Sequence, residues 1–254
     1  MTEIQKRLFE DLCILKGILD KNNISYYLAY GTLLGAVRHH GFIPWDNDVD
    51  IYVKIQDIPR LRMVLNKEDC RLKIHDHTSH ANYPYSIPKV VDVKSILKEK
   101  EFEHLDYECG VYIDLFPLIE IPDNKYYRFW LEKKRYFYYG LVKYYNIRQR
   151  RFLRLHKFIK KMINLSSVHT RMEENLLSPQ RNGFYVTDPL AFDEKLQYPK
   201  AIFEKTVEVV FEGVQFKAPA DFEYYLNKTY GDYMQLPPEN QRVANHDFVF
   251  KIQD

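Results

Sequence analysis

The chain has 254 residues, of which 46% are hydrophobic, and this is enough to bury the core of one large domain or of two smaller ones. No run approaches the roughly 18 to 20 apolar residues of a membrane-spanning helix, and the N-terminal MTEIQKRLFEDL mixes charges where a signal peptide is apolar. The cysteines, Cys13, Cys70 and Cys109, lie too far apart to suggest a disulfide framework or a zinc site. We therefore predict a soluble cytoplasmic protein.

The net charge of +2 conceals an uneven distribution. Residues 125–161, called the basic segment below, contain thirteen Lys or Arg and one acid, Glu132. This segment carries +12 and the remainder of the chain −10, so the basic surface is concentrated in one region.

Hydrophobic spacing and the positions of Gly, Pro and Asn predict the elements of the N-terminal half. In chain order we expect helix 4–19, strand 25–30, helix 32–38, strand 48–54, helix 57–66, strand 87–93 and strand 111–118.

The C-terminal half is predicted to be largely helical. A helical pattern covers 123–163, with a break expected near Gly140. A hairpin is expected over 206–217 with Glu212-Gly213 as its turn, and Asp221 is expected to cap a helix that ends at Gly231. This mix favours an α+β or α/β fold with a small mixed sheet.

Three aspartates, Asp46, Asp48 and Asp50, crowd into GFIPWDNDVDIYVK, where a strand is expected to begin. Because residues i and i+2 of a strand face the same side, Asp48 and Asp50 should lie side by side, with Val49 and Ile51 facing the core. Paired carboxylates repel each other unless a cation lies between them, and their oxygens suit Mg²⁺ or Mn²⁺. We expect Asp46 to support this site from the loop rather than to bind the ion.

A third carboxylate, Asp114, stands among apolar residues in VYIDLFPL, where an unpaired charge would cost several kcal/mol. Three such acids would suit a metal site that neutralises the attacking and leaving oxygens of a phosphoryl transfer. The alternative is that they cap loops or pair with lysines, as most single aspartates do. The density of acids beside apolar runs favours the metal site.

Upstream, Gly31 and Thr32 stand at the start of the expected short helix. Backbone N–H groups and the helix dipole favour phosphate at such a position. A Gly-Thr pair alone also fits a simple helix start, and only its combination with the aspartates favours a phosphate site.

The run YGTLLGAVRHHGFIPWDNDVDIYV resembles the signature of the LicD family, also called the LicD/fukutin-related phosphotransferases, within the nucleotidyltransferase superfold. Downstream, YPYSIPKVVD is similar to the family's lysine-containing strand, GVYIDLFPL to its third-aspartate strand, and YGDYMQLPPENQRVANH to its C-terminal motif. These blocks extend from Tyr27 to His246, although Asn47 stands where many members have another acid.

The resemblance implies an α+β nucleotidyltransferase-like fold, with a small mixed sheet flanked by helices. It implies one domain over 1–254, with a core over about 24–120, a helical basic part over about 123–180 and a C-terminal hairpin, helix and motif over about 200–247. Matched by position, the metal ligands are Asp48, Asp50 and Asp114, and the phosphate turn is Gly31 and Thr32.

The resemblance also implies a CDP-activated donor. Bacterial members transfer phosphocholine from CDP-choline to a sugar of teichoic acid, lipopolysaccharide or capsule, and animal relatives transfer phosphoribitol. We therefore predict a transferase in which a glycan hydroxyl attacks the choline-bearing phosphorus and CMP leaves. A carboxylate, Asp114 in our interpretation, would help to deprotonate the acceptor.

Several cationic and aromatic residues are candidates for substrate contacts. Arg38, Lys89 and Arg242 are predicted to reach the diphosphate. His39, His40 and His246 are candidates for the acid or base, although single histidines are more often structural. Aromatic faces would hold a quaternary ammonium, and the candidates near the motifs are Trp45, Tyr83, Tyr85, Tyr112, Tyr230 and Tyr233.

Other interpretations remain open at this stage. The donor alcohol could be ribitol, glycerol or ethanolamine, or the enzyme could move a nucleoside monophosphate from an NTP to a small molecule, protein or RNA end. A non-enzymatic binding module is the third alternative. In the leading interpretation no nucleic acid partner is expected.

The basic segment, with RRFLRL at 150–155, invites a separate hypothesis. It would hold an anionic polymer, or lie on the inner membrane leaflet where a lipid-linked acceptor is found. The alternative is a solvated basic face on an ordinary helix.

Overall fold

The computed structural model describes residues 1–99, 105, 107–146, 161–177, 185–188, 196–244 and 248–252. The N-terminal half contains α1 (Glu3–Lys21), β1 (Tyr26–Leu28), α2 (Tyr30–His39), β2 (Asp50–Lys54), η1 (Ile55–Asp57), α3 (Ile58–Lys67), β3 (Leu72–His75), β4 (Lys89–Asp92), β5 (Ser95–Glu99) and β6 (Tyr112–Ile121). The C-terminal half contains α4 (Lys125–Asn146), α6 (Leu165–Leu177), β7 (Tyr185–Thr187), β8 (Tyr198–Pro199), η3 (Lys200–Phe203), β9 (Thr206–Phe211), β10 (Val214–Pro219), α7 (Phe222–Tyr230), η4 (Glu239–Gln241) and β11 (Phe248–Ile252).

A mixed sheet forms the centre of the molecule, with the strand order β1-β2-β6-β4-β3. Strand β2 runs parallel to β6, whereas β1, β4 and β3 join by antiparallel pairing. The far end of β6 pairs with β7, which pairs with β8. Two further ribbons, β9–β10 and β5–β11, complete the strands of the described residues.

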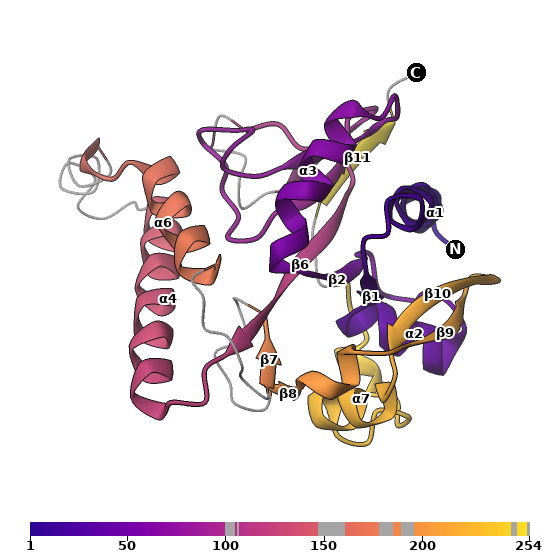
Figure 1. The fold of residues 1–254 in the computed structure, drawn as a ribbon. Helices are drawn as coiled ribbons and strands as arrows, with labels where there is room; N and C mark the ends of the chain where they lie inside the picture. The colour runs from indigo at the N-terminus through magenta and orange to yellow at the C-terminus, as the bar shows by residue number, and fades with distance from the viewer. Residues whose placement is uncertain are drawn as a thin grey trace.

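Helices α1 and α3 pack on the sheet, α1 against β6 and α3 against β3. Helix α1 presents Leu8, Leu12 and Leu15 to the core at helical spacing, and Thr2 and Gln5 close its N-terminus with a capping box. Figure 1 shows α4 and α6 side by side at one edge of the molecule, away from α1 and α7.

The predicted α+β class is confirmed, and most N-terminal elements lie within two residues of their expected bounds. The hairpin turn is also confirmed, because Glu212 and Gly213 both have positive φ values, 49° and 80°. The break near Gly140 was wrong, since α4 continues through that residue. Strands β3, β5, β7, β8 and β11 were not predicted.

Candidate active site

Asp50, Asp114 and Lys89 form a row across three neighbouring strands. Asp50 of β2 is the register partner of Asp114 in β6, and Asp114 is in turn the partner of Lys89 in β4. All three are buried, and Lys89 Nζ lies 2.5 Å from Asp114 Oδ1. The structure therefore brings Asp50 and Asp114 to one place, as predicted, but it pairs Lys89 with a carboxylate rather than leaving it open to a phosphate.

Asp48 and Asp46 add negative charge beside this row. Burial raises the pKa of Asp50 well above its usual value, and the charges of Asp48, Asp114 and Asp46 raise it further, whereas Lys89 lowers it. Asp48 is half-buried and precedes the first residue of β2, so the predicted strand began two residues too early. An ionised Asp50 is unfavourable here without an additional cation.

The first turn of α2 is fastened to the start of β2. The Ala29 N–H donates to the Asp50 carbonyl at 3.0 Å, and the Asp50 N–H donates to Thr32 Oγ1 at 2.8 Å. A Cβ added to Gly31 would lie 2.6 Å from Asp46 Oδ2, so only glycine admits this carboxylate so close to the helix start. Thr32 thus positions Asp50, and Asp46 lies against the turn that was predicted to hold phosphate.

Tyr30 carries backbone strain beside this turn. Its φ of 42° is unusual for a non-glycine residue. Its N–H donates to the Tyr225 hydroxyl at 3.1 Å, and its own hydroxyl donates to Asp188. Sequence reasoning missed Asp188, because its partner lies 158 residues away and no motif joins them.

Arg38 binds the C-terminal motif. Its Nη1 donates to the Tyr233 carbonyl at 2.8 Å and to the Gln235 carbonyl at 3.3 Å. Arg242 donates through Nε to the Pro237 carbonyl at 2.8 Å, with its guanidinium carbon 5.8 Å from the centre of the Trp45 ring. Both arginines therefore help to hold the 233–242 segment, Arg38 against α2 and Arg242 near Trp45, and a phosphate contact for either stays a prediction.

The histidine candidates differ in their surroundings. Burial lowers the pKa of His39, and the charges of Arg38 and His40 lower it further. Its ring packs edge-on against Trp45 with centroids 6.3 Å apart. His40 ends α2 with a φ of 58°, and His246 lies outside the described residues.

Tyrosines next to Lys89 already surround a cation. The Lys89 ammonium lies 4.2 Å from the centre of the Tyr85 ring and 3.6 Å from that of Tyr112. The two rings and Asp114 thus form the kind of box that would suit choline, but Lys89 occupies it. Tyr230 lies elsewhere, near the acids: desolvation, and then the charges of Asp50, Asp46 and Asp48, raise the pKa of its hydroxyl.

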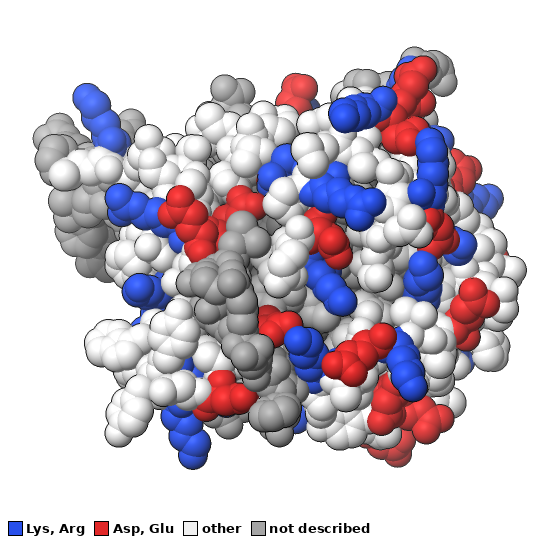
Figure 2. Space-filling model, viewed as in Figure 1, with Lys and Arg blue, Asp and Glu red and all other residues white. Residues whose placement is uncertain are grey.

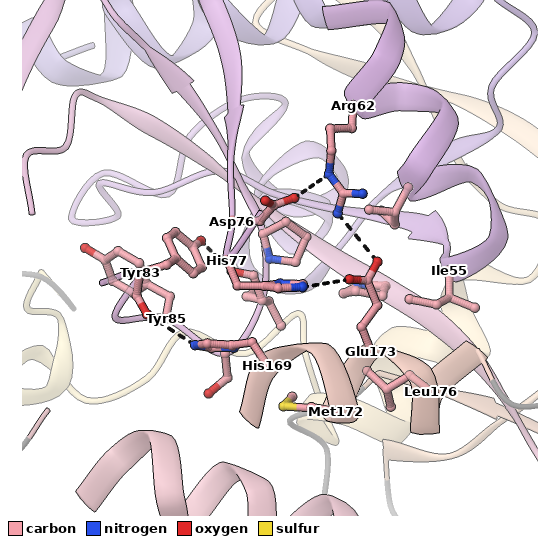
Figure 3. Close-up of a pocket in the computed structure, with 15 residues that line it drawn as sticks. Ile55, Arg62, Asp76, His77, Tyr83, Tyr85, His169, Met172, Glu173 and Leu176 are labelled. Carbon is pink, nitrogen blue, oxygen red and sulfur yellow. Dashed lines mark hydrogen bonds and ion pairs between the residues drawn. The ribbon is translucent and has the colours of Figure 1, made fainter. Parts of the chain in front are cut away.

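A cavity of about 40 Å³, lined in part by Tyr85, lies between α3, residues 76–88 and α6 (Figure 3). Its rim contains a closed polar network in which Arg62 contacts Asp76 at 2.6 Å and Glu173 at 3.5 Å, and His77 contacts Glu173 at 3.1 Å. The remainder is lined by apolar residues and by Tyr83, Tyr85, Ser86 and His169. This network ties α6 to α3 beside the cavity.

The side chains around Asp50 suit a hard divalent cation in their chemistry, because the carboxylates of Asp48, Asp114 and Asp46 lie near it and such cations prefer oxygen ligands. The Lys89 ammonium is the one positive charge among these neighbours. In the described part of the chain, however, no group of three or more His, Cys, Asp or Glu side chains has a geometry that would hold a metal ion as it stands. Lys89 pairs with Asp114 at 2.5 Å. An ion bound by Asp48, Asp50 and Asp114 would therefore compete with Lys89 for Asp114.

Comparison with known proteins decides the family. The family model described as "LicD/FKTN/FKRP, nucleotidyltransferase domain" matches residues 23–159, more than half of the chain, and includes the whole row of Asp50, Asp114 and Lys89. The chain belongs to the LicD family.

Curated relatives extend the match beyond this range. This LicD family member is 27% identical to the lipopolysaccharide cholinephosphotransferase LicD of Haemophilus influenzae, over 90% of this chain and 89% of that protein. It is 45% identical over 42 residues to the ribitol 5-phosphate transferase FKRP of Homo sapiens, which is 16% of this chain and 8% of that protein. An uncharacterised Rickettsia prowazekii protein is 52% identical over 48 residues, 19% of this chain and 18% of that protein. The prediction of a transferase is confirmed by this family.

Proposed function

We propose that this LicD family member transfers phosphocholine from CDP-choline to a hydroxyl of a cell-surface glycan and releases CMP. The observation that carries this proposal is the row of Asp50, Asp114 and Lys89, in which buried carboxylates from two parallel strands converge. The relatives' names support transfer of a phosphorylated alcohol, since one is a cholinephosphotransferase and another a ribitol 5-phosphate transferase.

Asp48, Asp50 and Asp114 would hold Mg²⁺ or Mn²⁺ in this proposal. The ion would supply positive charge to the donor diphosphate and to the leaving CMP oxygen. The acceptor oxygen forms the new bond to the choline-bearing phosphorus, while the bond from that phosphorus to the CMP oxygen breaks. The proton of the acceptor hydroxyl passes to the Asp114 carboxylate.

The surrounding residues have positioning roles. Thr32 fixes the backbone of Asp50 through its hydroxyl oxygen, and Lys89 orients Asp114. Arg38 holds the 233–235 segment against α2, which closes this side of the site. We propose that Gly31 is required because it admits the Asp46 carboxylate.

Choline is favoured over other alcohols by the aromatic surroundings. Tyr85 and Tyr112 already flank one ammonium group beside the site, and Tyr83 and Tyr85 wall the neighbouring cavity. Such rings suit a trimethylammonium group, whereas ribitol or glycerol would require polar groups around their hydroxyls.

A donor panel tests this proposal. CMP release would be measured with CDP-choline, CDP-ethanolamine, CDP-glycerol and CDP-ribitol, each with Mg²⁺ and with a chelator, in the presence of an acceptor glycan preparation. We expect chelator-sensitive release that is fastest from CDP-choline. Release from none of the four would overturn the proposal, and preference for another alcohol would overturn only the choline assignment.

Nucleotidyl transfer is the second candidate, favoured by the nucleotidyltransferase description of the family domain. It would attack the α-phosphorus of an NTP and release pyrophosphate. Pyrophosphate release from NTPs, without CMP release from any CDP-alcohol, would replace the leading proposal with this one.

A further inference from the structure

Helix α4 exposes a row of aromatic side chains. Tyr126 is 84% exposed, Trp130 64% and Phe137 61%, and their spacing places them on one side of the helix. Phe129 flanks them, 51% exposed, with its ring centre 5.7 Å from that of Trp130. These four residues are called the aromatic row. Contiguous exposed apolar surface of this kind marks an interaction site.

Lysines share the same side of α4. Lys133 lies between Trp130 and Phe137 on the helix surface, and its Nζ is 5.2 Å from the centre of the Phe129 ring. Lys133 and its neighbour Lys134 are both exposed. The one acid in the α4 sequence, Glu132, is half-buried and accepts a hydrogen bond from Gln197 at 3.5 Å. The exposed side of α4 is therefore aromatic and positively charged.

The opposite side of α4 faces the protein. Arg135, Val142 and Asn146 are buried on that side, and α4 packs along α6. Figure 2 shows uncharged side chains projecting together with Lys and Arg at the edge where α4 lies in Figure 1. The aromatic row is thus at the periphery of the described structure, where a large flat partner can reach it.

We propose that the aromatic row, with Lys133 and Lys134, is a docking face for an anionic lipid bilayer, on which α4 lies parallel to the surface. Aromatic rings lie at the level of lipid headgroups, with an apolar body toward the acyl chains. Lysines near the surface gain from anionic headgroups. None of the helices formed by the described residues combines the length and apolar composition that crossing a bilayer requires.

Charge complementarity selects the bilayer over other occupants. The α4 sequence contains six Lys or Arg and one acid, so two copies of this face would repel each other. A soluble anionic polymer would satisfy the lysines, but it would leave the indole and phenyl rings in water. A bilayer with anionic headgroups pairs with the lysines and also removes the aromatic rings from water. This inference does not depend on which donor the enzyme uses.

Vesicle binding tests the proposal. The full chain would be sedimented with vesicles of phosphatidylcholine alone and with vesicles that contain about 30% phosphatidylglycerol. We expect binding to the anionic vesicles only, with a loss of binding near 0.5 M NaCl because salt screens the lysines at roughly that ionic strength. Trp130 emission should shift to the blue on binding, and Trp130→Phe should bind while losing most of that shift.

Matched variants distinguish binding through the exposed face of α4 from binding through the positive charge of the chain as a whole. The double variant Lys133→Gln/Lys134→Gln should bind anionic vesicles about 30-fold more weakly, from about fivefold per lysine. Trp130→Ala/Phe137→Ala should weaken binding by about tenfold or more. The control Lys94→Gln/Lys98→Gln, which alters two exposed lysines near and in β5, should change it less than about twofold. Circular dichroism would confirm that each variant is folded.

Other outcomes of these experiments would contradict the proposal or assign the α4 face to a second copy of the chain or to a soluble anionic polymer. Equal binding to both vesicle types, binding to neither, or an equal effect of the control variant would overturn the proposal. So would concentration-dependent dimers that the α4 substitutions abolish, which would make a second copy the occupant. Binding to dextran sulfate without binding to anionic vesicles would assign the face to a soluble anionic polymer instead.

Discussion

At the scale of single residues, Asp50 is placed where its charge destabilises the fold. Burial and the charges of Asp48, Asp114 and Asp46 all disfavour its ionised form. A chain selected for stability alone would not keep these acids together, so their cost is best explained by a function. Lys89 offsets part of the repulsion through its ion pair with Asp114.

Replacement of Asp50 by Asn should therefore stabilise the protein in the absence of metal. The amide keeps the shape of the side chain and removes one of the mutually repelling charges, so we expect the free energy of unfolding at pH 7 to rise by about 1 to 2 kcal/mol. Urea unfolding of the variant and of the parent protein measures the difference. A clear loss of stability would contradict the electrostatic account of this site.

Alanine substitutions of Gly31 and Gly17 can be compared directly, because only Gly31 of the two lies against a carboxylate. In Gly31→Ala the new Cβ would meet Asp46 Oδ2 at 2.6 Å, so the carboxylate must move, and we expect CMP release to fall about tenfold. Gly17→Ala meets nothing within 4 Å on an exposed position of α1, and should raise stability by about 0.5 to 1 kcal/mol without affecting activity. Enzyme assays and thermal unfolding of both variants check this contrast; equal activity of the two would remove the role assigned to Gly31.

At the scale of elements, a buried histidine holds helix α6 against residues 76–88, between β3 and β4. His169 is buried with its ring stacked on His77, centroids 5.5 Å apart, and Asp76 and Glu173 lie nearby. Burial, followed by the charge of His77, lowers the pKa of His169 to about 4. In the unfolded chain a histidine titrates near 6.5.

Stability should consequently fall as the pH decreases from about 6.5 toward 4. In that window the unfolded chain binds a proton at position 169 that the folded protein excludes, which removes about 2 kcal/mol near pH 5. His169→Gln should flatten this part of the pH profile of thermal unfolding. An identical slope in His169→Gln and in the parent protein would refute the assignment.

Local patterns predicted the elements that build the site. Alternation around Asp50 and Asp114 was enough to predict two strands with acids on one face, and the β9–β10 turn was encoded by Glu212-Gly213. By contrast, β11 could not be predicted, because FVFKI becomes a strand only by pairing with β5 about 150 residues earlier. The partner of Lys89 depends on the register of β4 against β6, and the partner of Arg38 depends on the position of the 233–235 segment. No local sequence pattern specifies either contact.

At the scale of the whole molecule, buried side chains connect the two halves of the sequence. One hydrophobic cluster contains Leu8 of α1, Val53 of β2, Phe211 of β9 and Tyr225 of α7. We propose on this basis that the chain folds as one domain, with a single cooperative unfolding transition. Within it the acids of the row lie near α2 and α7, whereas α4 with its aromatic row lies at the far edge (Figure 1).

We propose above all that Asp50 and Asp114 carry out transfer of a phosphorylated alcohol. The most direct test is Mg²⁺-dependent CMP release from CDP-choline by the parent protein, Asp50→Asn, Asp114→Asn and the control Asp57→Asn in η1, outside the site. We predict that the first two variants, folded by circular dichroism, lose about 10³-fold or more in kcat while Asp57→Asn stays near the parent rate. Release by Asp50→Asn and Asp114→Asn at rates near that of the parent would contradict the account.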